Sequence, residues 1–489
     1  MTIDQILSQV KENNPKADLD LIQLAYDFAK IAHAGQKRKS GEPYVQHCLH
    51  TAYTLAQIKA DTPTIIAGLL HDVPEDTTFT IEDIEKNFGA EVATLVDGIT
   101  KLSKIKYRGV ERYIESLRKM FLAIISDLRI ALIKFADRLH NLKTLDAQTP
   151  EKQLRIAKET IEIYAPIAGL LGVEHLKWQM EDICFKYIYP EEYKKLEYRY
   201  EVEKKIERNE YFAKIKHILT TGLADAEIKH EINHRFKHLY SIYQKMQDKD
   251  RQFNEIYDVF AMRIIVDDIP DCYRALGIVH ALWKPAHKRF KDYIALPKPN
   301  GYKSLHTTVF GPGGRPTEFQ IKTIKMHEEA RFGIAAHWQY KRKNDKPESQ
   351  PKWIQEVLDL QNDAKNSLEF IQQSKINIFK DRIFVFTPKG DVIDLPINAT
   401  SVDLAYAVHT NIGNQCSGSI INGKIASLDT PLKNGAVIEI IREKKRIYPN
   451  TNWLKFAQTH RAREKIKQHS RYAKFGNIAK YLPSLPLKK

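Results

Sequence analysis

The spacing of apolar residues changes its period about 195 residues into the chain, and this change constrains the fold more than any other feature. Up to that point apolar residues recur at helical spacing, for example over residues 21–32, 65–70, 130–145 and 154–168. After a charged connector over residues 196–230, runs of strand length alternate with helical segments. The sequence therefore predicts an all-α domain followed by an α/β domain.

The elements expected in the α/β domain and beyond follow from the same patterns. Strands are predicted over residues 259–266, 305–310 and 318–323, and a helix over 272–282. A polar loop over 341–352 and a helix over 353–373 should come next. The remaining unit should contain a hairpin over 383–395 that turns at 388–391, a helix over 401–409, and turns at Asn422-Gly423 and Asn434-Gly435.

Length and composition narrow the class of protein. The chain has 489 residues, enough for about three domains. It has no run of about 18 apolar residues, and Met1–Gln5 lacks the pattern of a signal peptide. The four cysteines are far apart and form no CxxC pair; they are Cys48, Cys184, Cys272 and Cys416. We expect a cytoplasmic protein with reduced thiols and no membrane partner, disulfide framework or zinc finger.

Most of the net positive charge lies near the C-terminus. Between Arg442 and Lys489 there are fourteen Lys and Arg against two Glu, which places +12 of the total +15 in this segment. Such a segment is typical of proteins that bind a polyanion, and its aromatic residues favour RNA, on whose bases they can stack. A solvated helix face or a solubilising tail has the same composition, so both interpretations remain open.

Four ionisable residues directly follow the apolar run over 65–70. They form the pairs His71-Asp72 and Glu75-Asp76. Ionisable groups beside a hydrophobic segment are costly unless their charge is compensated, and a divalent metal ion compensates it economically. We therefore expect a metal site at the end of this helix.

Two further residues complete the predicted site. His47 lies upstream and Asp137 lies in the helical pattern downstream, so that helices can bring both to the same point. With His71 and Asp72 they form a mixed nitrogen and oxygen set, which suits Mn, Fe or Zn. A single histidine on an apolar helix is more often a core residue, but this combination favours metal-dependent hydrolysis.

The surrounding residues suit the same chemistry. Glu75 or Asp76 would position or deprotonate a water whose pKa the metal lowers. Arg38 and Lys39 suit a contact with a phosphate or a base.

The motifs around this site resemble the HD hydrolase domain of the RelA/SpoT homologues. The matching segments occur in the family's order; they are Arg38–Tyr44, Leu69–Asp72, Phe88-Gly89, Val96–Lys101, Ala136–Asn141 and Glu159–Ala165. The resemblance implies an all-α domain that removes pyrophosphate from the 3′ position of guanosine tetra- and pentaphosphate, (p)ppGpp. It implies Mn²⁺ on the positions of His47, His71, Asp72 and Asp137, a water-activating pair at Glu75-Asp76, and a further site residue at Asn141.

Two departures from the family lie at this site: Cys48 replaces the usual proline after His47, and Pro74 lies beside Glu75 and Asp76. Pro74 stands where the family usually has Val or Ile. Because a proline donates no backbone hydrogen bond and perturbs the preceding turn, its effect on Glu75 and Asp76 is left open.

The α/β domain carries a second group of ionisable residues, suited to nucleotide phosphates. Its basic members are Arg235, Lys237, Lys245, Arg263, Lys288, Arg289, Lys291 and Lys298. Asp258 and Glu318 each stand at the start of an expected strand, so that Mg²⁺ could be held between them. Alternation puts Glu318, Gln320 and Lys322 on one face, away from the core. The same residues would also occur on a solvent-exposed sheet surface covered with ion pairs, which is the alternative interpretation.

Four segments of this domain resemble the synthetase domain of the same family. They are His238–Tyr243, Arg289–Ile294, Pro297–His306 and Ala336–Trp338. The resemblance implies an α/β nucleotidyltransferase-like domain that transfers pyrophosphate from ATP to the 3′-hydroxyl of GDP or GTP and releases AMP. The basic motif Arg289–Asp292 resembles that of members with both activities.

The same resemblance implies roles for single residues. Asp258 would bind Mg²⁺, and Glu318 would bind Mg²⁺ or act as the base for the 3′-hydroxyl. Tyr302 would stack on guanine and Arg235 would contact ATP. The other substrate contacts expected in the domain are Lys237, Ser241, Lys245, Arg263, Lys298 and His306.

A further departure lies beside Arg235. His234 and Phe236 stand where the family usually has Gly and Pro. Whether their bulk impairs synthesis is left open.

The C-terminal part resembles further modules of the family. Residues 378–443 resemble the TGS domain, a small β-grasp fold that contacts uncharged tRNA in ribosome-bound relatives. His409 matches a histidine implicated there, although a lone histidine is more often structural. Residues 453–467 resemble the start of the helical domain that follows. The zinc-finger-like and ACT modules of long members are not expected in this chain.

We therefore predict a bifunctional alarmone synthetase and hydrolase. Its expected parts are an HD hydrolase domain (1–195), a synthetase domain with a helical connector (196–340), a linker and helix (341–377), a TGS domain (378–443) and a basic helical segment (444–489). The expected partners are ATP, GDP or GTP, (p)ppGpp and, through the last two parts, the ribosome and uncharged tRNA. Two alternatives remain: a hydrolase with a regulatory synthetase domain, and a catalytically silent regulator that binds the ribosome or tRNA.

Overall fold

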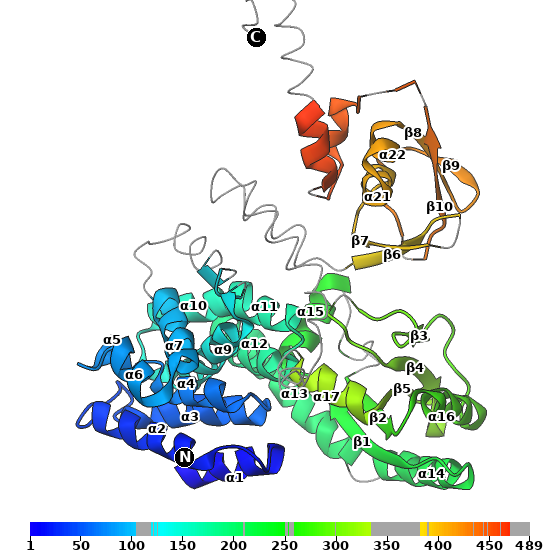
Figure 1. Cartoon of the computed structure of the whole chain (residues 1–489). Coiled ribbons are helices and arrows are strands. Elements are labelled where there is room, and N and C mark those ends of the chain that lie inside the picture. The colour runs from blue at the N-terminus through cyan, green and yellow to red at the C-terminus, as the bar shows by residue number, and fades with distance from the viewer. Residues whose placement is uncertain are drawn as a thin grey trace, which may run out of the picture. The chain divides into compact units, whose positions relative to one another are not determined.

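The chain folds into two compact units, Met1–Lys346 and Pro347–Lys489, each with its own hydrophobic clusters (Figure 1). The computed structural model describes residues 1–103, 119–120, 122–124, 126–208, 211–249, 253, 259–298, 300–333, 382–388, 391–433, 435–443, 445–446, 448–459 and 461–469. The predicted loop over 341–352, the predicted helix over 353–373 and Asp258 lie outside these residues.

The regular elements of the first half of unit one are helices, as the apolar spacing predicts. They are α1 (Ile3–Asn13), α2 (Leu19–Ala32), α3 (Val45–Gln57), α4 (Thr62–Leu70), α5 (Val73–Asp76), α6 (Ile81–Phe88), α7 (Ala90–Ser103), α9 (Leu128–Lys143), α10 (Pro150–Glu159), α11 (Ala165–Leu170) and α12 (Glu174–Ile188). A 3-10 turn at Leu145–Ala147 and a π-helical turn at Thr160–Tyr164 join neighbouring helices. The expected helix over 154–168 is thus continued through a π turn.

Local sequence determines where α4 begins. The Asp61 carboxylate accepts a hydrogen bond from the Thr64 amide, and Pro63 occupies the first turn, where no N–H is needed. Every residue of Thr64–Leu70 is buried, because α4 packs against α2, α3 and α7. The residue that follows, His71, is therefore carried into the protein interior, where it is 1% exposed.

The second half of unit one contains the expected mixture of strands and helices. Two connector helices, α13 (Pro190–Arg208) and α14 (Tyr211–Asp225), precede it. The strands are β1 (His230–Phe236), β2 (Phe260–Val266), β3 (Lys291–Asp292), β4 (Leu305–Phe310) and β5 (Pro316–Thr323), and the helices are α15 (Leu239–Lys249), α16 (Ile269–Leu282) and α17 (Ile324–Phe332). The strand order is β1-β2-β5-β4-β3, and within it β2 and β5 are parallel whereas the other pairs are antiparallel.

Three strands differ from the prediction: β1 and the two-residue strand β3 were not expected, and β5 begins earlier than expected. The alternating pattern of β1 is obscured by polar residues, so this strand was not expected. Strand β5 begins at Pro316, so that Glu318 lies inside it rather than at its start. The side chains of Phe319 and Ile321 lie in the core, as alternation predicts, and leave a polar face on the opposite side of the sheet.

Unit two is a small α+β fold. Strands β6 (Arg382–Phe386) and β7 (Val392–Pro396) form the predicted hairpin, and β8 (Cys416–Ile421), β9 (Lys424–Ala426) and β10 (Ile438–Arg442) form a second sheet in the order β10-β8-β9. Helices α21 (Ser401–Val408) and α22 (Thr410–Asn414) lie between the two sheets in the sequence. Asn422 and Gly423 form the predicted turn with positive φ at both residues, the combination favoured in two-residue hairpins.

A buried aspartate attaches the following segment to this fold. One oxygen of Asp403 accepts hydrogen bonds from the amide and hydroxyl of Thr400, and the other accepts from the amides of Gln458 and Thr459 and from the Thr459 hydroxyl. A 3-10 turn at Thr451–Lys455 and a helix over 461–469 therefore pack on α21 through Trp453 and Ala462.

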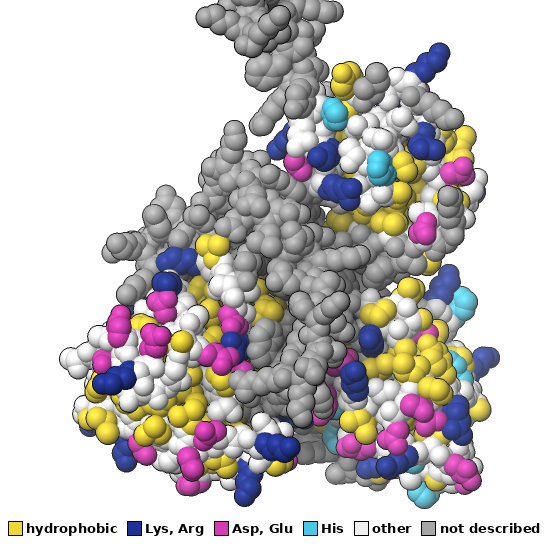
Figure 2. All heavy atoms as spheres, in the orientation of Figure 1, with side chains coloured by type: hydrophobic (Ala, Val, Ile, Leu, Met, Phe, Trp, Pro, Cys, Tyr) yellow, Lys and Arg dark blue, Asp and Glu magenta, His cyan; other side chains and the backbone are white. Residues whose placement is uncertain are grey.

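The surfaces of the two units carry charge differently. On the face shown in Figure 2, acidic and basic side chains are interspersed over unit one, whereas Lys and Arg predominate over Asp and Glu on unit two. Among the described residues, no helix is long and apolar enough to cross a membrane. All four cysteines are buried free thiols.

Candidate functional sites

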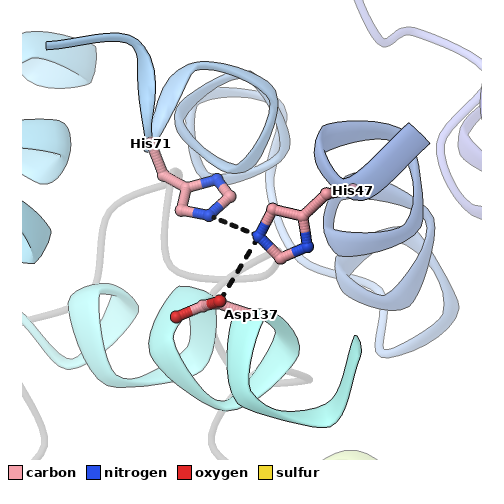
Figure 3. A group of neighbouring side chains, drawn as sticks. All are labelled: His47, His71 and Asp137. Atoms are coloured by element: carbon pink, nitrogen blue, oxygen red, sulfur yellow. Dashed lines mark hydrogen bonds and ion pairs between the residues drawn. The ribbon is translucent and has the colours of Figure 1, made fainter. Parts of the chain in front are cut away.

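Three of the four predicted metal ligands converge in the helical domain. His47 comes from α3, His71 directly follows α4, and Asp137 comes from α9 (Figure 3). One donor atom from each lies within 4.8 Å of the donor atoms of the others, and all three residues are buried. The helices α3, α4 and α9 pack against one another, so their packing fixes this convergence.

The fourth predicted ligand, Asp72, lies against the same two imidazoles. Its Oδ2 atom is 3.3 Å from Nε2 of His47 and 3.2 Å from Nε2 of His71. Oδ1 of Asp137 lies 3.4 Å from Nε2 of His47 on another side. The structure thus brings together all four residues that the sequence pointed to.

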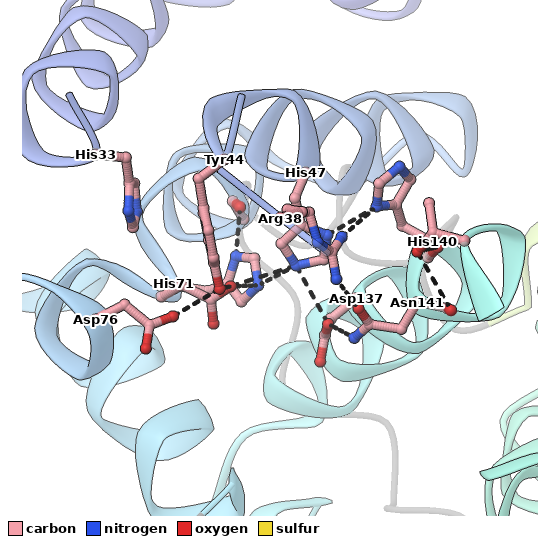
Figure 4. A network of polar contacts seen from close by, with 12 residues as sticks. His33, Arg38, Tyr44, His47, His71, Asp76, Asp137, His140 and Asn141 are labelled. Carbon is pink, nitrogen blue, oxygen red and sulfur yellow. Dashed lines mark hydrogen bonds and ion pairs between the residues drawn. The ribbon is translucent and has the colours of Figure 1, made fainter. Parts of the chain in front are cut away.

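Hydrogen bonds behind the imidazoles determine which nitrogens face inward with lone pairs. Nδ1 of His71 lies 2.9 Å from the Gly68 carbonyl, to which it can only donate, so a neutral His71 has an unprotonated Nε2. A guanidinium N–H of Arg38 donates to Nδ1 of His140, so Nδ1 of His47, 2.8 Å from that same nitrogen, must carry the proton. A neutral His47 then also has an unprotonated Nε2; the contacts among Arg38, His140 and His47 are drawn in Figure 4.

The electrostatics indicate a neutral His140 and a cluster that favours a positive charge. Burial and the cationic neighbours of His140 lower its pKa to about 2, so His140 is a neutral acceptor. Burial alone would raise the pKa of Asp137, but Lys134 and the two imidazoles lower it far below its usual range. Burial would also lower the pKa of His71, yet Asp72 and Asp137 raise it to about 9. The carboxylates are ionised and the cluster attracts positive charge.

The donor set fits a divalent metal ion. The Nε2 atoms of His47 and His71 are 3.2 Å apart, and their lone pairs face each other beside two carboxylate oxygens. This arrangement requires a shared proton or a cation. Imidazoles together with carboxylates are typical ligands of first-row divalent ions. The residues behind them, His140, Gly68 and Lys134, contact the ligands and hold them in orientation, as the hydrogen-bond partners of metal ligands commonly do.

The predicted water-handling pair lies at the edge of this cluster. Glu75 and Asp76 are exposed and belong to the single turn α5. Pro74 lies in the first turn of α5, where a missing N–H interrupts no helical hydrogen bond, and the amides of Glu75 and Asp76 both donate to the Asp72 carbonyl. The turn therefore accommodates Pro74.

The predicted substrate residues lie beside the metal ligands. Arg38 donates to the Asn141 amide oxygen, and Asn141 in turn donates to Oδ1 of Asp137. Lys39 is exposed and reaches Gln148 at 3.4 Å. Arg38 and Asn141 are thus joined directly to the cluster, whereas Lys39 lies at its rim.

A continuous row of contacting polar side chains, the polar chain, crosses the sheet of the α/β domain. The Tyr302 hydroxyl lies 2.8 Å from Nε2 of His306, whose Nδ1 lies 3.5 Å from Oε1 of Glu318. Gln320 donates to Glu318 at 3.0 Å, and Arg235 donates to Gln320 at 3.3 Å. These side chains come from β4, β5 and β1 and from the turn before β4, so the sheet assembles them from distant parts of the sequence.

An open pocket of about 220 Å³ lies on this face. It is lined by Arg235, Lys237, Ala261, Glu318 and Gln320. Strand pairing places Arg235 opposite Ala261 and Ala261 opposite Glu318, and the small alanine leaves the space between the two charged residues open. A guanidinium and a carboxylate thus face one pocket.

Positive charge accumulates at one end of the same face. Lys322 is 3% exposed, and burial together with Arg263 and Arg235 lowers its pKa well below the usual lysine value. The Nε atom of Arg263 is buried and has no hydrogen-bond partner among the described residues. Burial and Arg235 also lower the pKa of Arg263. A face of this kind favours an anionic ligand.

The remaining predicted residues of this domain lie around the polar face or outside the described chain. Ser241 and Lys245 lie on α15 and are partly exposed. The Lys298 ammonium lies 5.2 Å from the centre of the Tyr302 ring. The pairing of Asp258 with Glu318 around Mg²⁺ stays a prediction, because Asp258 is not among the described residues.

The bulky neighbours of Arg235 do not enter the pocket. In a strand, alternate residues point to opposite faces, so His234 and Phe236 point away from Arg235. They pack against aromatic rings of the connector helices: His234 stacks on Phe212 at 5.8 Å, and Phe236 meets Tyr200 at 6.4 Å. The packing accounts for their bulk without crowding the pocket.

In unit two, His409 forms a local contact. Its Nδ1 accepts a hydrogen bond from the Asn411 amide and caps α22, while the residue is exposed. This capping bond accounts for the position of the ring, and its role toward RNA stays a prediction.

Several residues of the helical site escaped the sequence reasoning. Tyr44, Lys134 and His140 all contact predicted metal-site residues. Helical spacing carried a signal for each, because Tyr44 precedes His47 by three residues, and Lys134 and His140 stand three residues before and after Asp137. Residues three positions from a predicted ligand on the same helix are therefore the first candidates for contacts that support the metal site.

Together these observations define a class of protein: an HD-type metal domain of helices followed by an α/β domain with a basic polar face on its sheet and by a small α+β unit. Family profiles agree. An HD domain matches residues 25–174, the region found in RelA/SpoT proteins matches residues 234–345, and a TGS domain matches residues 383–442. The predicted combination of fold classes is confirmed. The chain belongs to the RelA/SpoT homologue family.

Relatives carry names of two kinds. The chain is 45% identical over 465 residues to a GTP pyrophosphokinase of Myxococcus xanthus, covering 94% of this chain and 61% of that protein. It is 45% identical over 472 residues to a guanosine-3′,5′-bis(diphosphate) 3′-pyrophosphohydrolase of Aquifex aeolicus, covering 96% and 67%. The chain thus spans about 60% of the length of most curated relatives it matches.

A solved structure of a metazoan orthologue of SpoT that hydrolyses ppGpp is 29% identical, with a TM-score of 0.28, over 34% of this chain and 94% of that one. Membership of this family implies the use of a divalent metal ion, in agreement with the His/Asp cluster.

Proposed function

We propose that the chain both makes and degrades guanosine tetra- and pentaphosphate in the stringent response. The observation that carries this proposal is the presence of two chemically different sites in one chain. The helical site brings together imidazole nitrogens and carboxylate oxygens, which suit a metal cation. The polar face of the α/β domain brings together basic side chains, which suit anionic phosphates. Relatives named for each of the two activities support the pairing.

Hydrolysis is assigned to the helical site. The metal would supply a Lewis acid and a water of lowered pKa; the ion proposed is Mn²⁺ on His47, His71, Asp72 and Asp137. Glu75 or Asp76 takes the proton of the attacking water. Arg38 and Asn141 bind the nucleotide. The bond between the 3′ oxygen and phosphorus breaks, pyrophosphate leaves, and the 3′-hydroxyl of GDP or GTP is regenerated.

Synthesis is assigned to the polar face of the α/β domain. Tyr302 stacks on the guanine, and the ammonium of Lys298 over its ring reaches the phosphates of GDP or GTP. Glu318, at the centre of the polar chain, takes the proton of the 3′-hydroxyl, whose oxygen attacks the β-phosphorus of ATP. The bond from that phosphorus to the α-phosphate oxygen breaks and AMP leaves. Such transfers depend on positioning and charge neutralisation, which the basic residues supply.

The remaining contacts of the synthetic site are assigned by their place on or near this face. Arg235, Lys237 and Arg263 would bind ATP, with Ser241 and Lys245 of α15 nearby, and His306 would orient Glu318. Mg²⁺ on Asp258 and Glu318 would neutralise phosphate charge.

The partners proposed beyond nucleotides are the ribosome and uncharged tRNA. They would be bound in the cytoplasm by the TGS domain, including His409, and by the basic segment that follows. The attachment of that segment through Asp403 supports a single binding surface formed by both.

Among the described residues of the α/β domain, no contact favours the alternative of a hydrolase with a degenerate synthetase domain. The residues that suggested it, His234 and Phe236, face away from the pocket. A catalytically silent regulator would not require the intact donor set of the helical site.

Two incubations test the proposal. The purified chain is mixed with ATP, GDP and Mg²⁺, with and without ribosomes, and separately with guanosine tetraphosphate and Mn²⁺; nucleotides are followed by chromatography. We expect AMP with guanosine tetraphosphate in the first mixture and GDP with pyrophosphate in the second. The absence of AMP under both conditions would refute synthesis, and intact guanosine tetraphosphate in the second mixture would refute hydrolysis.

A further inference from the structure

One tyrosine hydroxyl lies between two carboxylates at the edge of the helical site. Oη of Tyr44 is 2.9 Å from Oδ2 of Asp72 and 2.6 Å from Oδ2 of Asp76 (Figure 4). Oδ2 of Asp72 is the oxygen that also faces the two imidazoles. The hydroxyl therefore connects a proposed metal ligand with one of the two residues proposed to handle water.

The phenol carries one proton and can donate it to only one oxygen at a time. A phenol is protonated at neutral pH, because its ordinary pKa is about 10. The shorter contact is to Asp76. When the inward lone pairs of Asp72 are engaged by a cation, this oxygen is the poorer acceptor, and the proton remains with Asp76.

The ring of Tyr44 is itself held from behind. It stacks on His33 with a centroid distance of 4.6 Å and an interplanar angle of 15°. Nδ1 of His33 lies 2.8 Å from the side-chain oxygen of Gln36, and the Gln36 amide group donates to the backbone carbonyl of Asp76 at 2.8 Å. The backbone of Asp76 and its carboxylate are thus held by two connected routes that both begin at the end of α2.

These contacts matter because the position of Asp76 in the fold does little to fix its carboxylate. It is exposed and lies at the last position of a four-residue helix. An exposed carboxylate on a single turn samples several rotamers, whereas proton transfer requires a fixed orientation within hydrogen-bond reach.

We propose that Tyr44 is a positioning residue for hydrolysis: its hydroxyl donates to Asp76 and fixes that carboxylate beside the metal-facing oxygen of Asp72, while His33 and Gln36 hold the tyrosine ring and the turn. This inference rests on the proposed hydrolase function and adds that Asp76, rather than Glu75, is the carboxylate oriented toward the water.

The test compares Tyr44→Phe with wild type in the complete chain. Phenylalanine keeps the stack on His33 and removes only the hydroxyl. We expect kcat for hydrolysis of guanosine tetraphosphate to fall about 10- to 100-fold, the usual cost of losing such a supporting contact. KM should stay within about twofold, because no substrate contact is removed. Tyr53→Phe, on the same helix α3, is the matched control and should leave kcat unchanged.

A second readout separates action through Asp76 from action through the metal. The dissociation constant for Mn²⁺, measured without nucleotide by titration calorimetry, should change by less than about threefold in Tyr44→Phe. A large loss of Mn²⁺ affinity, with kcat recovered at excess Mn²⁺, would show that the hydroxyl serves Asp72 and would overturn the proposal. An unchanged kcat would overturn it too.

The outcomes also separate this inference from the proposed function. If wild type does not hydrolyse guanosine tetraphosphate, the function itself fails. If wild type is active and Tyr44→Phe is equally active, only the role of Tyr44 fails. An altered melting temperature would point to a packing defect, so Gln36→Leu, which leaves the tyrosine in place, provides the second variant: it should lower kcat in the same direction without changing Mn²⁺ affinity.

Discussion

The two candidate sites of unit one differ in the charge of the side chains that they bring together. In the helical site, Lys134 and the imidazoles compensate the carboxylates within the cluster, and Asp137 is strongly ionised as a result. On the α/β sheet, Lys322, Arg263 and Arg235 lie together: burial and Arg235 lower the pKa of Arg263, and burial and both arginines lower the pKa of Lys322. The first site brings together carboxylates and imidazole nitrogens, which suit a cation, whereas the second brings together cationic side chains, which suit an anion. The charge of the ligand expected at each site can therefore be inferred from the charges of the side chains that surround it.

The largest expected effect comes from breaking the compensation in the helical site. Asp137→Ala leaves Lys134 buried without its carboxylate, which should cost about 3–5 kcal/mol of stability and abolish hydrolysis. Calorimetric melting would show the loss, with the exposed Asp146→Ala as control. Adding Lys134→Met to Asp137→Ala should restore most of the stability but no activity. If the single variant melts like wild type, the two charges do not depend on each other.

Ligand-induced stabilisation should divide between the two sites. At about 100 times its dissociation constant, either Mn²⁺ or ATP should stabilise the folded chain by about 2.7 kcal/mol. In Asp72→Ala the shift in melting temperature with Mn²⁺ should disappear and the shift with ATP should remain. A loss of both shifts would contradict the separation of the sites.

A smaller effect of opposite sign is expected for the cationic site. Lys322→Met removes a buried amine that has no carboxylate partner among the described residues, and it should stabilise the protein by about 1–3 kcal/mol at pH 7, while lowering synthesis at least about tenfold. The folded protein lowers the pKa of Lys322, so the unfolded chain binds this proton more tightly, and wild-type stability rises with pH up to about 10.5.

The gain from Lys322→Met should therefore shrink as the pH approaches 10. Melting temperatures measured from pH 7 to pH 10 would show this, with the exposed Lys325→Met as control. A gain that is the same at every pH would argue against the titration of Lys322.

The smallest effect concerns a contact between the helical and α/β halves. Lys59 pairs with Glu328 at 2.5 Å, but both side chains are about one-third exposed. Lys59→Gln should cost less than about 1 kcal/mol and change neither activity by more than about twofold. Steady-state kinetics of both reactions would check this. A change of tenfold or more in one activity would mean that this pair couples the two sites.

The sequence was most informative where chemistry and helical periodicity coincide. His47, His71, Asp72 and Asp137 could be named in advance because apolar helices and unusual ionisable residues occur together there. The hydroxyl of Tyr44 between two carboxylates could not be named, because the relevant distances depend on how α3, α5 and the end of α2 pack.

The α/β site was less accessible from the sequence. The polar strand β1 gave no strand signal, although its pairing with β2 places Arg235 across from Ala261. The side on which His234 and Phe236 lie follows only once this strand is known. Burial of Lys322 was also not foreseeable, since its face is polar but covered, as its 3% exposure shows.

The central claim is that two separable sites in one chain carry opposite reactions. It is tested most directly by measuring both reactions in two variants, Asp72→Ala and Asp258→Ala. The account predicts that Asp72→Ala makes guanosine tetraphosphate from ATP and GDP but does not degrade it, and that Asp258→Ala degrades it but does not make it. Loss of both reactions in either folded variant, or retention of hydrolysis in Asp72→Ala, would contradict the account.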